Sequence, residues 1–149
     1  MTQWLDDAQQ SAWRKLIEVV ELLPGALDSQ LRRDAELSHF DYFTLAMLSE
    51  APGRTLRMTA LAALTNSSLP RLSHVASRLE QRGYLERAQC PDDRRATVAT
   101  LTESGWQKVV ATAPGHVETV RDLVFANLDA SDVADLDRIM GRVLGRLGR

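Results

Sequence analysis

Arginines, serines and one histidine are the residues with the clearest chemical potential, and they gather in the middle of the chain. Ser67, Ser68, Arg71 and His74 lie close together, and the pair Arg94-Arg95 follows further along. A guanidinium group can bind phosphate or bond to both O6 and N7 of guanine, and serine or histidine can donate to bases and phosphates. These residue types therefore predict nucleic-acid binding.

Positive charge is concentrated in the same stretch. Residues 54–95 contain eight arginines, no lysine and four acidic residues, a net charge of +4, whereas the rest of the chain has ten basic and sixteen acidic residues, a net charge of −6. The overall charge of −2 hides this division. A basic segment between acidic flanks is typical of a phosphate-facing surface on a folded protein.

Motifs for catalysis and metal binding are absent from the sequence. It contains no G-x-S-x-G, no glycine-rich phosphate loop, no H-E-x-x-H and no cysteine–histidine nucleophile pair. The single cysteine, Cys90, excludes an intrachain disulfide, and the three histidines lack the spacing of metal ligands. We therefore expect a protein that is not an enzyme and that needs no metal or cofactor.

Neither a secretion signal nor a membrane segment is expected. The first ten residues, MTQWLDDAQQ, carry acidic charges, whereas a signal peptide begins with basic ones. No run approaches the ~18 apolar residues of a membrane-spanning helix. The prediction is a cytoplasmic protein.

Hydrophobic spacing predicts the elements that position the basic residues. Residues 58–64 form a predicted short helix, residues 65–68 a turn rich in capping residues, and a second helix ends before Gly83. Two β-prone runs, residues 84–87 and 96–101, flank a turn and predict a hairpin. The order predicts a mainly α fold with a small β-hairpin wing, the winged helix-turn-helix, next to a helical dimerisation arm.

The second helix of this motif is the expected reader of base sequence. A major groove about 12 Å wide accepts one α-helix, whose N-terminal residues face the base edges. In this chain these residues are Ser67, Ser68, Arg71 and His74, and Arg78 on the same helix is included with them. The expected partner is double-stranded DNA, read in a sequence-specific manner.

The hairpin turn is expected to supply a second set of contacts. A thin projection that carries Arg94 and Arg95 suits a minor groove about 6 Å wide, where negative potential attracts arginine. We expect Asp93 to hold the side chain of Arg95 through a charge-assisted hydrogen bond. Contact with phosphate and a solvated surface position are both open interpretations for Arg78, Arg82 and Arg87.

Helical segments flank the predicted lobe. Apolar residues recur at helical spacing over residues 4–31, with an interruption or kink at Pro24-Gly25, and again in a long helix from residue 102 that should kink at 113–115. Ser131 is the expected cap of a last helix. Because these apolar stripes are wide and far apart in sequence, we expect two chains to bury them against each other. The predicted division is a dimerisation segment at 1–38, a DNA-binding lobe at 39–103 and dimerisation helices at 104–149.

Three motifs in combination resemble the MarR (multiple antibiotic resistance regulator) family. Residues 79–87, L-E-Q-R-G-Y-L-E-R, are followed by P-D-D-R-R at 91–95 and by L-T-E-S-G at 101–105. The resemblance covers nearly the whole chain and implies an intertwined homodimer on a pseudo-palindromic operator, usually as a repressor and often released by a small aromatic ligand. By position it implies groove contacts for Ser68, Arg71 and His74, and a wing-tip role for Arg95 with Asp93 as its partner.

A group of aromatic side chains has two interpretations. Trp13, His39, Phe40 and Phe43 could line a crevice for a small aromatic effector, between the dimer arm and the DNA-binding lobe. The other interpretation, which we prefer, places most of them in the core, because a chain with few aromatic residues needs them there.

Two alternatives remain open around the wing. Oxidation of Cys90, whose thiolate nearby arginines would favour, could disturb the wing and weaken DNA binding, or Cys90 could be a passive, partly exposed residue. The whole lobe could also be a protein–protein module without DNA binding, although the +4 segment and the Arg94-Arg95 tip argue against this interpretation.

Overall fold

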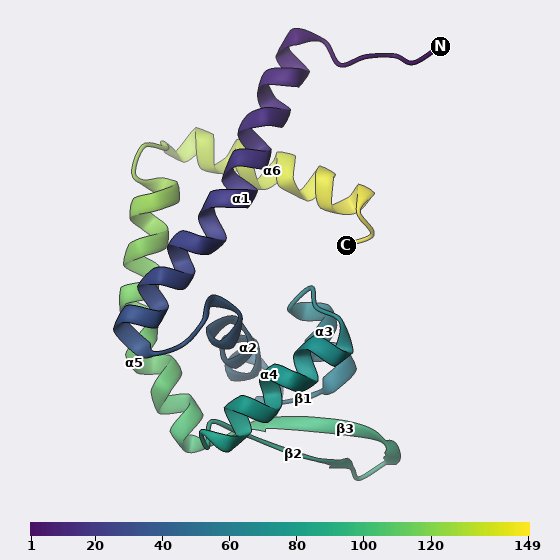
Figure 1. The fold of residues 1–149 in the computed structure, drawn as a ribbon, viewed down its shortest axis with the longest axis vertical. Coiled ribbons are helices and arrows are strands. Elements are labelled where there is room, and N and C mark those ends of the chain that lie inside the picture. Colours follow the sequence, from purple (N-terminus) through teal and green to yellow (C-terminus); the bar gives the residue numbers. More distant parts are fainter. The chain divides into compact units, whose positions relative to one another are not determined.

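The computed structural model describes residues 1–149 and divides into two compact units, residues 1–116 and 117–149, each of which is described by itself. None of its helices is both long and apolar enough to cross a membrane. The helices and strands, labelled in Figure 1, are α1 (Asp7–Ala35), α2 (His39–Glu50), β1 (Thr55–Arg57), α3 (Met58–Leu64), α4 (Leu69–Gln81), β2 (Leu85–Cys90), β3 (Asp93–Leu101), α5 (Glu103–Val120) and α6 (Ala130–Arg146).

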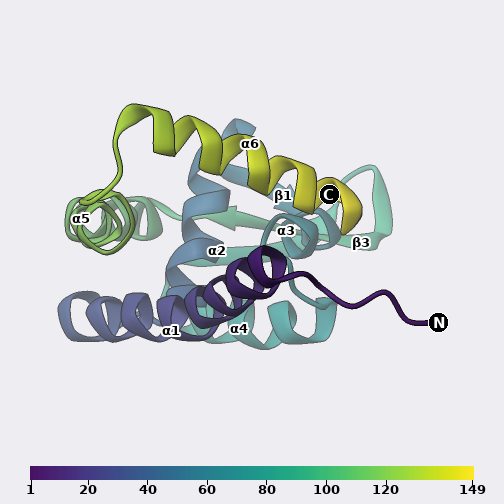
Figure 2. The ribbon, with the colours of Figure 1, turned by 90° about the horizontal axis from the view of Figure 1, so that it is seen from above.

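The core of the first unit lies between a small antiparallel sheet and helices α2, α3 and α4. The strand order is β1-β3-β2, so β3 is central. Figure 1 shows the β2–β3 hairpin extending past the helices, and Figure 2 shows the same projection from above, beyond α3. Aliphatic side chains fill the interior, and each fully buried leucine contributes roughly 2 kcal/mol through its removal from water. The fully buried leucines are Leu31, Leu37, Leu45, Leu48, Leu61, Leu72, Leu79 and Leu85.

The mainly α architecture and the winged helix-turn-helix are confirmed, but the wing has a third strand. Strand β1 pairs with β3, where Thr55 lies opposite Thr100 and their hydroxyls are 2.8 Å apart. The predicted two-stranded hairpin therefore covered only part of the sheet. A strand of three residues is too short to produce an alternating pattern in sequence.

Helix α1 runs unbroken from Asp7 to Ala35, so of the two expectations at Pro24-Gly25 the interruption is wrong, and a kink within one helix stays a prediction. A proline removes its own N–H from the helix and crowds one carbonyl, but the hydrogen bonds on both sides hold a long helix together. Helix α5 likewise continues past Pro114 to Val120.

The start of α5 explains the L-T-E-S-G motif. The Thr102 hydroxyl donates to the Gly83 carbonyl at 2.6 Å and accepts from the Gly105 N–H at 3.0 Å, so it caps the helix. A Cβ atom at Gly105 would lie 2.0 Å from the Tyr84 carbonyl oxygen. The glycine therefore permits the first turn of α5 to pack directly on the backbone that enters the wing.

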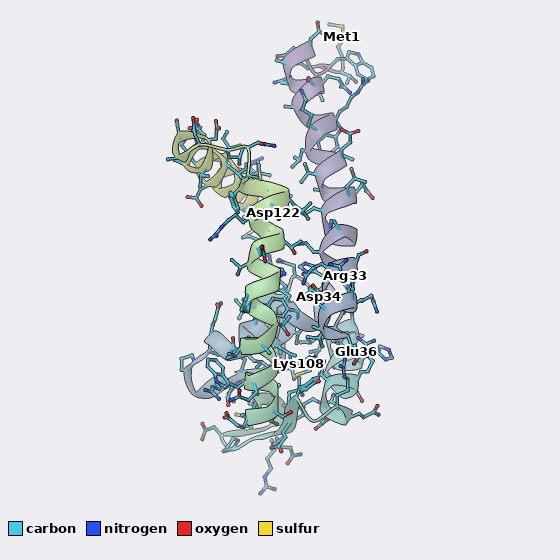
Figure 3. All side chains as sticks on the ribbon, turned by 90° about the vertical axis from the view of Figure 1, so that its left-hand side faces the viewer. Met1, Arg33, Asp34, Glu36, Lys108 and Asp122 are labelled. Carbon is cyan, nitrogen blue, oxygen red and sulfur yellow. The ribbon has the colours of Figure 1, made fainter.

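A second glycine brings α5 close to α1 within the first unit. A Cβ atom at Gly115 would lie 3.5 Å from the Gln30 amide nitrogen and 4.0 Å from Asp34 Oδ2. Figure 3 shows Asp34 between the two helices. The Gln30 amide also donates to Asp34 at 3.0 Å, which places a polar contact at this approach.

In the second unit, α6 begins earlier than the sequence indicated. Its N-cap is Asp129, whose carboxylate accepts from the Asp132 N–H at 2.8 Å, while the Asp132 carboxylate accepts from the Asp129 N–H. The expected cap, Ser131, instead lies inside the first turn. An aspartate satisfies the free N–H groups of a helix start at least as well as a serine does, so both were eligible.

We predict that Gly105→Ala lowers the free energy of unfolding by about 3 kcal/mol or more, because the new methyl group overlaps a backbone oxygen that cannot move alone. Urea denaturation followed by circular dichroism measures the change. The matched control is Gly25→Ala in α1, where nothing lies within 4 Å of the new Cβ and a gain of about 0.5–1 kcal/mol is expected. Equal stabilities for the two variants would contradict this packing.

Candidate nucleic-acid interface

Helix α4 is fixed in rotation by an apolar stripe on one side. Leu72, Val75, Ala76 and Leu79 are buried, at the spacing of three and four residues that defines one helix face. Positions on the opposite side are therefore held toward solvent. They include the predicted Arg71 and His74, both exposed.

In the turn before α4, two serine hydroxyls form hydrogen bonds with the backbone. The Ser68 hydroxyl accepts from the Arg71 N–H at 3.3 Å, and the Ser67 hydroxyl donates to the Ser68 carbonyl at 3.0 Å. Ser68 is therefore the N-cap of α4, a role that serine favours because it satisfies a free helix N–H. Both side chains remain at the exposed N-terminal end of α4.

Arg71 is oriented by an aromatic ring. Its guanidinium carbon lies 4.2 Å from the centre of the Phe40 ring, a cation–π contact between α4 and α2. The guanidinium forms no ion pair, so its charge and its hydrogen-bond donors stay available to a ligand.

Arg78 has a structural partner that the sequence did not reveal. It donates to Asp41 at 2.5 Å, and the exposed fraction of the Asp41 side chain is only 6%. Asp41 also accepts from the Ser38 N–H at 2.9 Å, which caps α2. A buried carboxylate needs such partners, so this ion pair holds α2 and α4 together.

Two further arginines are occupied by contacts within the lobe. Arg82 donates to the Glu36 carbonyl at 2.8 Å. Arg87 donates to Glu80 through its backbone N–H and its side chain, each at 3.0 Å, and these bonds, the backbone one first, lower the pKa of Glu80. Both arginines therefore brace neighbouring elements.

The wing tip holds the two arginines that remain unpaired there. Arg94 and Arg95 are exposed on β3, next to the turn at Pro91-Asp92, and neither guanidinium forms an ion pair within the chain. Asp93 accepts from the backbone N–H of Arg95 at 3.0 Å. The expected bond to the Arg95 side chain is absent, so Asp93 shapes the turn and leaves the guanidinium free.

Cys90 is more buried than the sequence indicated, with an exposed fraction of 7%. It ends β2 opposite Asp93, where the register between β2 and β3 shifts. Reactive cysteines lie in partly exposed environments, so this burial favours the passive interpretation over the redox hypothesis.

A separate cavity of about 660 Å³ opens between α1, α2 and α4. His39, Phe40 and Phe43 line it, as expected, together with Arg71 and His74 of α4. The His39 and Phe43 rings stack with centres 6.3 Å apart, and burial lowers the pKa of His39. The cavity therefore combines aromatic surface with cationic and imidazole groups.

Trp13 does not belong to this cavity, so its expected grouping with His39 and Phe43 is wrong. It lies in the N-terminal half of α1, half exposed, beside Arg14 and Ile17. Helix α1 is a single helix of which Pro24 and later residues line the cavity, whereas none before Pro24 does.

Three further polar residues are exposed or half-exposed on the same elements and were not among the predicted DNA-binding residues. Ser73 and Ser77 are half-exposed on α4, at helical spacing from Pro70 and His74. Counting three and four residues along the helix would have found them. Arg57 was missed for another reason, because it is an exposed residue of β1, the strand without a sequence signal.

The site thus consists of a capped helix whose outer face is polar and a hairpin tipped by unpaired arginines, which defines a winged helix-turn-helix protein. A model of the MarR family matches residues 38–96. The crystal structure of Sco3205, a MarR family transcriptional regulator from Streptomyces coelicolor in complex with DNA, aligns with a TM-score of 0.92 and 43% identity over 96% of this chain and 90% of that chain. This protein belongs to the MarR family.

Two curated relatives agree with this assignment. The HTH-type transcriptional regulator YdcH of Bacillus subtilis is 32% identical over 61% of this chain and 63% of its own length. The transcriptional repressor MprA of Escherichia coli K12 is 26% identical over 71% of this chain and 60% of its own length. The alignments thus span less than two thirds of either relative. Family members are transcriptional regulators, so the expectation that the chain is not an enzyme is confirmed.

We predict that removal of an ion-paired arginine destabilises the protein, whereas removal of an unpaired arginine of the wing does not. Arg78→Ala should lower the free energy of unfolding by about 2 kcal/mol, because it leaves the buried Asp41 carboxylate without its cation. Arg94→Ala, an exposed and unpaired position, should change it by no more than about 0.5 kcal/mol. Urea titration of both variants measures the difference, and a fully stable Arg78→Ala protein would remove the structural role assigned to this ion pair.

Proposed function

We propose that this protein is a sequence-specific transcription regulator that binds double-stranded DNA through α4 and the wing. The observation that carries the proposal is the pair of unpaired guanidinium groups, Arg94 and Arg95, on a hairpin that projects beside a capped, polar-faced helix. A guanidinium group that forms no ion pair within the protein is available to bind a phosphate or a DNA groove. The Arg78 guanidinium is less available, because it pairs with Asp41.

The dimensions of DNA give each element a place in the proposed complex. Helix α4 would enter the major groove with Arg71 and His74 toward the base edges, Ser67 and Ser68 at its leading end, and the wing would enter the adjacent minor groove. Sco3205, to which this chain is 43% identical, was crystallised in complex with DNA, which supports DNA as the partner. Contact of Arg78 with phosphate stays a secondary expectation, because its guanidinium is engaged with Asp41.

We propose a homodimer that binds a pseudo-palindromic operator in the cytoplasm. Within each unit, large apolar side chains are exposed at helical spacing: Val19 and Leu22 on α1, and Ile139 and Val143 on α6. Helix α6 contains no buried residue although it is strongly amphipathic. Apolar stripes of this kind need cover, which a second copy would supply, with residues 1–38 and 104–149 as the dimerisation parts around the lobe at 39–103.

Repression is the proposed regulatory outcome. A dimer seated across a promoter operator excludes other proteins from the same DNA without any further activity. MprA, with which this chain shares 26% identity, is a transcriptional repressor.

A small aromatic ligand is the proposed release signal, and the cavity between α1, α2 and α4 is its proposed site. Phe40 and Phe43 offer ring surface, and Arg71 and His74 belong both to this cavity and to the proposed DNA-reading face. A ligand that draws these two side chains into the cavity would compete with DNA for them. Among the arginines of the lining, Arg32 pairs with Asp28 and Arg78 with Asp41, whereas Arg71 forms no ion pair. An anionic aromatic compound suits this unpaired cation.

We predict that the double variant Arg94→Ala, Arg95→Ala binds duplex DNA at least about tenfold more weakly at 0.15 M salt. Its affinity should also depend less steeply on salt, by about one unit of slope for each phosphate that the protein no longer neutralises, because fewer counterions are released. Fluorescence anisotropy with a labelled duplex over a range of salt concentrations measures both quantities. Arg138→Ala on α6, whose arginine pairs with Asp135 at 3.1 Å, is the control and should match the unmodified protein. Unchanged binding by the double variant would favour the protein–protein module.

We predict that benzoate or 4-hydroxybenzoate raises the thermal stability of the protein through the α1–α2–α4 cavity. At a concentration about 100-fold above the dissociation constant, a ligand that binds only the folded state adds about 2.7 kcal/mol. Phe43→Ala should reduce the shift, whereas Trp13→Ala, outside the cavity, should not. Equal shifts in both variants, or none in the unmodified protein, would contradict the assigned site.

A further inference from the structure

Two histidines meet within the first unit, at the junction of α1, α2 and α5. His39 is the first residue of α2 and His116 lies on α5, and the centres of their rings are 6.4 Å apart. The His116 ring also packs against Tyr42 of α2, with ring centres 4.6 Å apart. These contacts join α5 to α2, so the charge of the two imidazoles affects how α5 is held.

The same junction contains buried polar atoms without a hydrogen bond. Three buried side-chain atoms of the chain lack a partner in the protein, and they are Nδ1 of His39, Nδ1 of His116 and Oε1 of Gln30. Gln30 of α1 belongs to the junction, because its amide nitrogen lies 3.5 Å from the Cβ position of Gly115, the residue before His116. Buried polar groups are nearly always paired, so three unpaired ones at one junction need an explanation.

The arrangement accommodates neutral imidazoles better than imidazolium ions. A neutral imidazole keeps one ring nitrogen unprotonated, whereas an imidazolium carries an N–H on both. Each buried Nδ1 would then be a donor without an acceptor, since Gln30 Oε1 bonds to neither. Burial lowers the pKa of both His39 and His116, and the neighbouring His39 lowers the pKa of His116 further.

Charges on the elements around His39 do not reverse this preference. On α1, the Asp28 carboxylate accepts from the His39 backbone N–H at 2.8 Å and attracts a proton to the ring, but it is already paired with Arg32. On α4, Arg71 and Arg78 line the same cavity as His39 and oppose a further positive charge. Burial outweighs the attraction of Asp28, so the pKa of His39 remains below its ordinary value.

The groups around His116, apart from His39, give it no free counter-charge. On α1, Asp34 faces α5 (Figure 3), and its carboxylate already accepts hydrogen bonds from two residues of its own helix. On α2, Tyr42 offers a phenol whose pKa burial raises, so it stays neutral. On α5 itself, Glu118 is exposed to solvent. A proton on His116 would therefore be favoured only if the ring left this packing.

We propose that His39 and His116 form an acid-sensitive switch, in which proton uptake by the pair loosens the packing of α5 on α2. Helix α5 is also held by its first turn, through Gly105, and by the buried Val109 and Thr112. Acid therefore releases α5 at His116 while its start stays attached beside the wing.

The consequence for DNA rests on the proposed function. In the proposed homodimer, the distance between the two α4 helices depends on how each lobe is held on its α5 helix. Two half-sites of one operator are read together only when this distance matches their spacing. Loosening of the α5–α2 contact would therefore weaken operator binding in acid.

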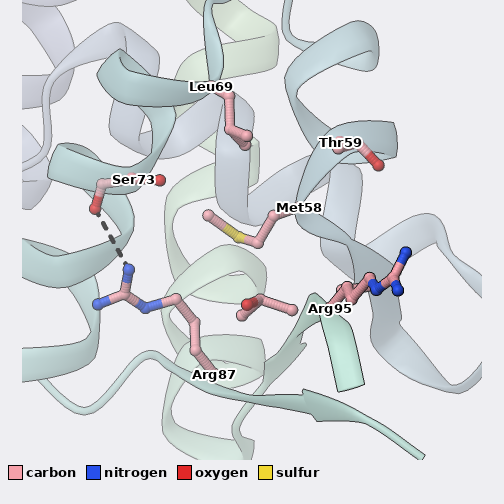
Figure 4. A pocket seen from close by; sticks show the side chains of 8 residues that line it. Met58, Thr59, Leu69, Ser73, Arg87 and Arg95 are labelled. Carbon is pink, nitrogen blue, oxygen red and sulfur yellow. Dashed lines mark hydrogen bonds between the residues drawn. The ribbon is translucent and has the colours of Figure 1, made fainter. Parts of the chain in front are cut away.

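Other parts of the lobe do not produce an acid response in this direction. Between α4 and the wing lies a hollow of about 180 Å³, lined by Arg87 and Arg95 but by no histidine or acidic residue (Figure 4). Arginine keeps its charge throughout this pH range. The third histidine, His74, is exposed on α4, where an added positive charge would strengthen the attraction to phosphate. A loss of affinity in acid therefore points to the pair.

The test compares DNA affinity at about pH 7.5 and about pH 5.5, at constant salt, by fluorescence anisotropy with the preferred duplex. The unmodified protein should bind at least about tenfold more weakly at the lower pH, since one pKa unit at one group changes an equilibrium tenfold. The double variant His39→Gln, His116→Gln carries amides that stay neutral, so it should not lose affinity in acid. His74→Gln is the matched control, and whatever its affinity at the higher pH, it should show the full loss.

Two further measurements need no DNA. In NMR spectra of the unmodified protein, the ring resonances of His39 and His116 should titrate below pH 6.5, the ordinary pKa of histidine. Because the unfolded chain then takes up protons more readily than the folded one, stability falls as the pH falls below this value. The urea midpoint should therefore be lower at about pH 5.5 than at about pH 7.5, with a smaller difference in the double variant.

The outcomes separate this proposal from the proposed function. A loss of affinity in acid that persists in the double variant, or titration of both rings at or above pH 6.5, overturns the switch and leaves DNA binding intact. Equal affinity of the unmodified protein at both pH values also overturns it. Absence of duplex binding at both pH values overturns the proposed function. In that case a urea midpoint that does not fall in acid, or that falls equally in the double variant, overturns the switch as well.

Discussion

The rotation of α4 about its own axis determines which of its side chains are buried and which are exposed. Burial of Leu72, Ala76 and Leu79 against the small core fixes that rotation, and each of these side chains contributes through its removal from water. Because the opposite face of α4 is buried, Arg71 and His74 lie on its exposed side. The Ser68 cap then sets where the exposed end begins. A polar, ligand-accessible face is thus a consequence of how the opposite face packs.

Arginines in the lobe divide according to what the fold already supplies them. Arg78, Arg82 and Arg87 have a carboxylate or a carbonyl within hydrogen-bond distance and hold α4 to α2, to the end of α1 and to β2. Those of the wing tip have no such partner. The charges of Arg78 and Arg87 are offset by Asp41 and Glu80, whereas the unpaired charges of the wing tip project with the hairpin.

Local pattern predicted most of the fold, whereas contacts distant in sequence remained hidden. The buried face of α4 and the hairpin could be predicted from the spacing of apolar residues, because helices and strands each have a characteristic side-chain period. Strand β1 is too short to show an alternating pattern. The expected interruption at Pro24 was wrong because the effect of a proline depends on the hydrogen bonds of the helix around it, which the sequence does not show. The Arg78–Asp41 pair spans two helices, and no spacing rule links those positions. Trp13 was grouped with Phe43 through residue type alone, and the length of α1 separates them.

We propose that two copies of this chain read duplex DNA through paired α4 helices and wings. Selection of bound sequences from a random duplex pool at physiological salt tests this proposal. A symmetric dimer predicts recovery of an inverted repeat, with half-sites whose centres lie one helical turn, about 34–36 Å, apart or a multiple of that distance. Recovery of no sequence above background would contradict the account and would favour a winged-helix module that binds protein instead.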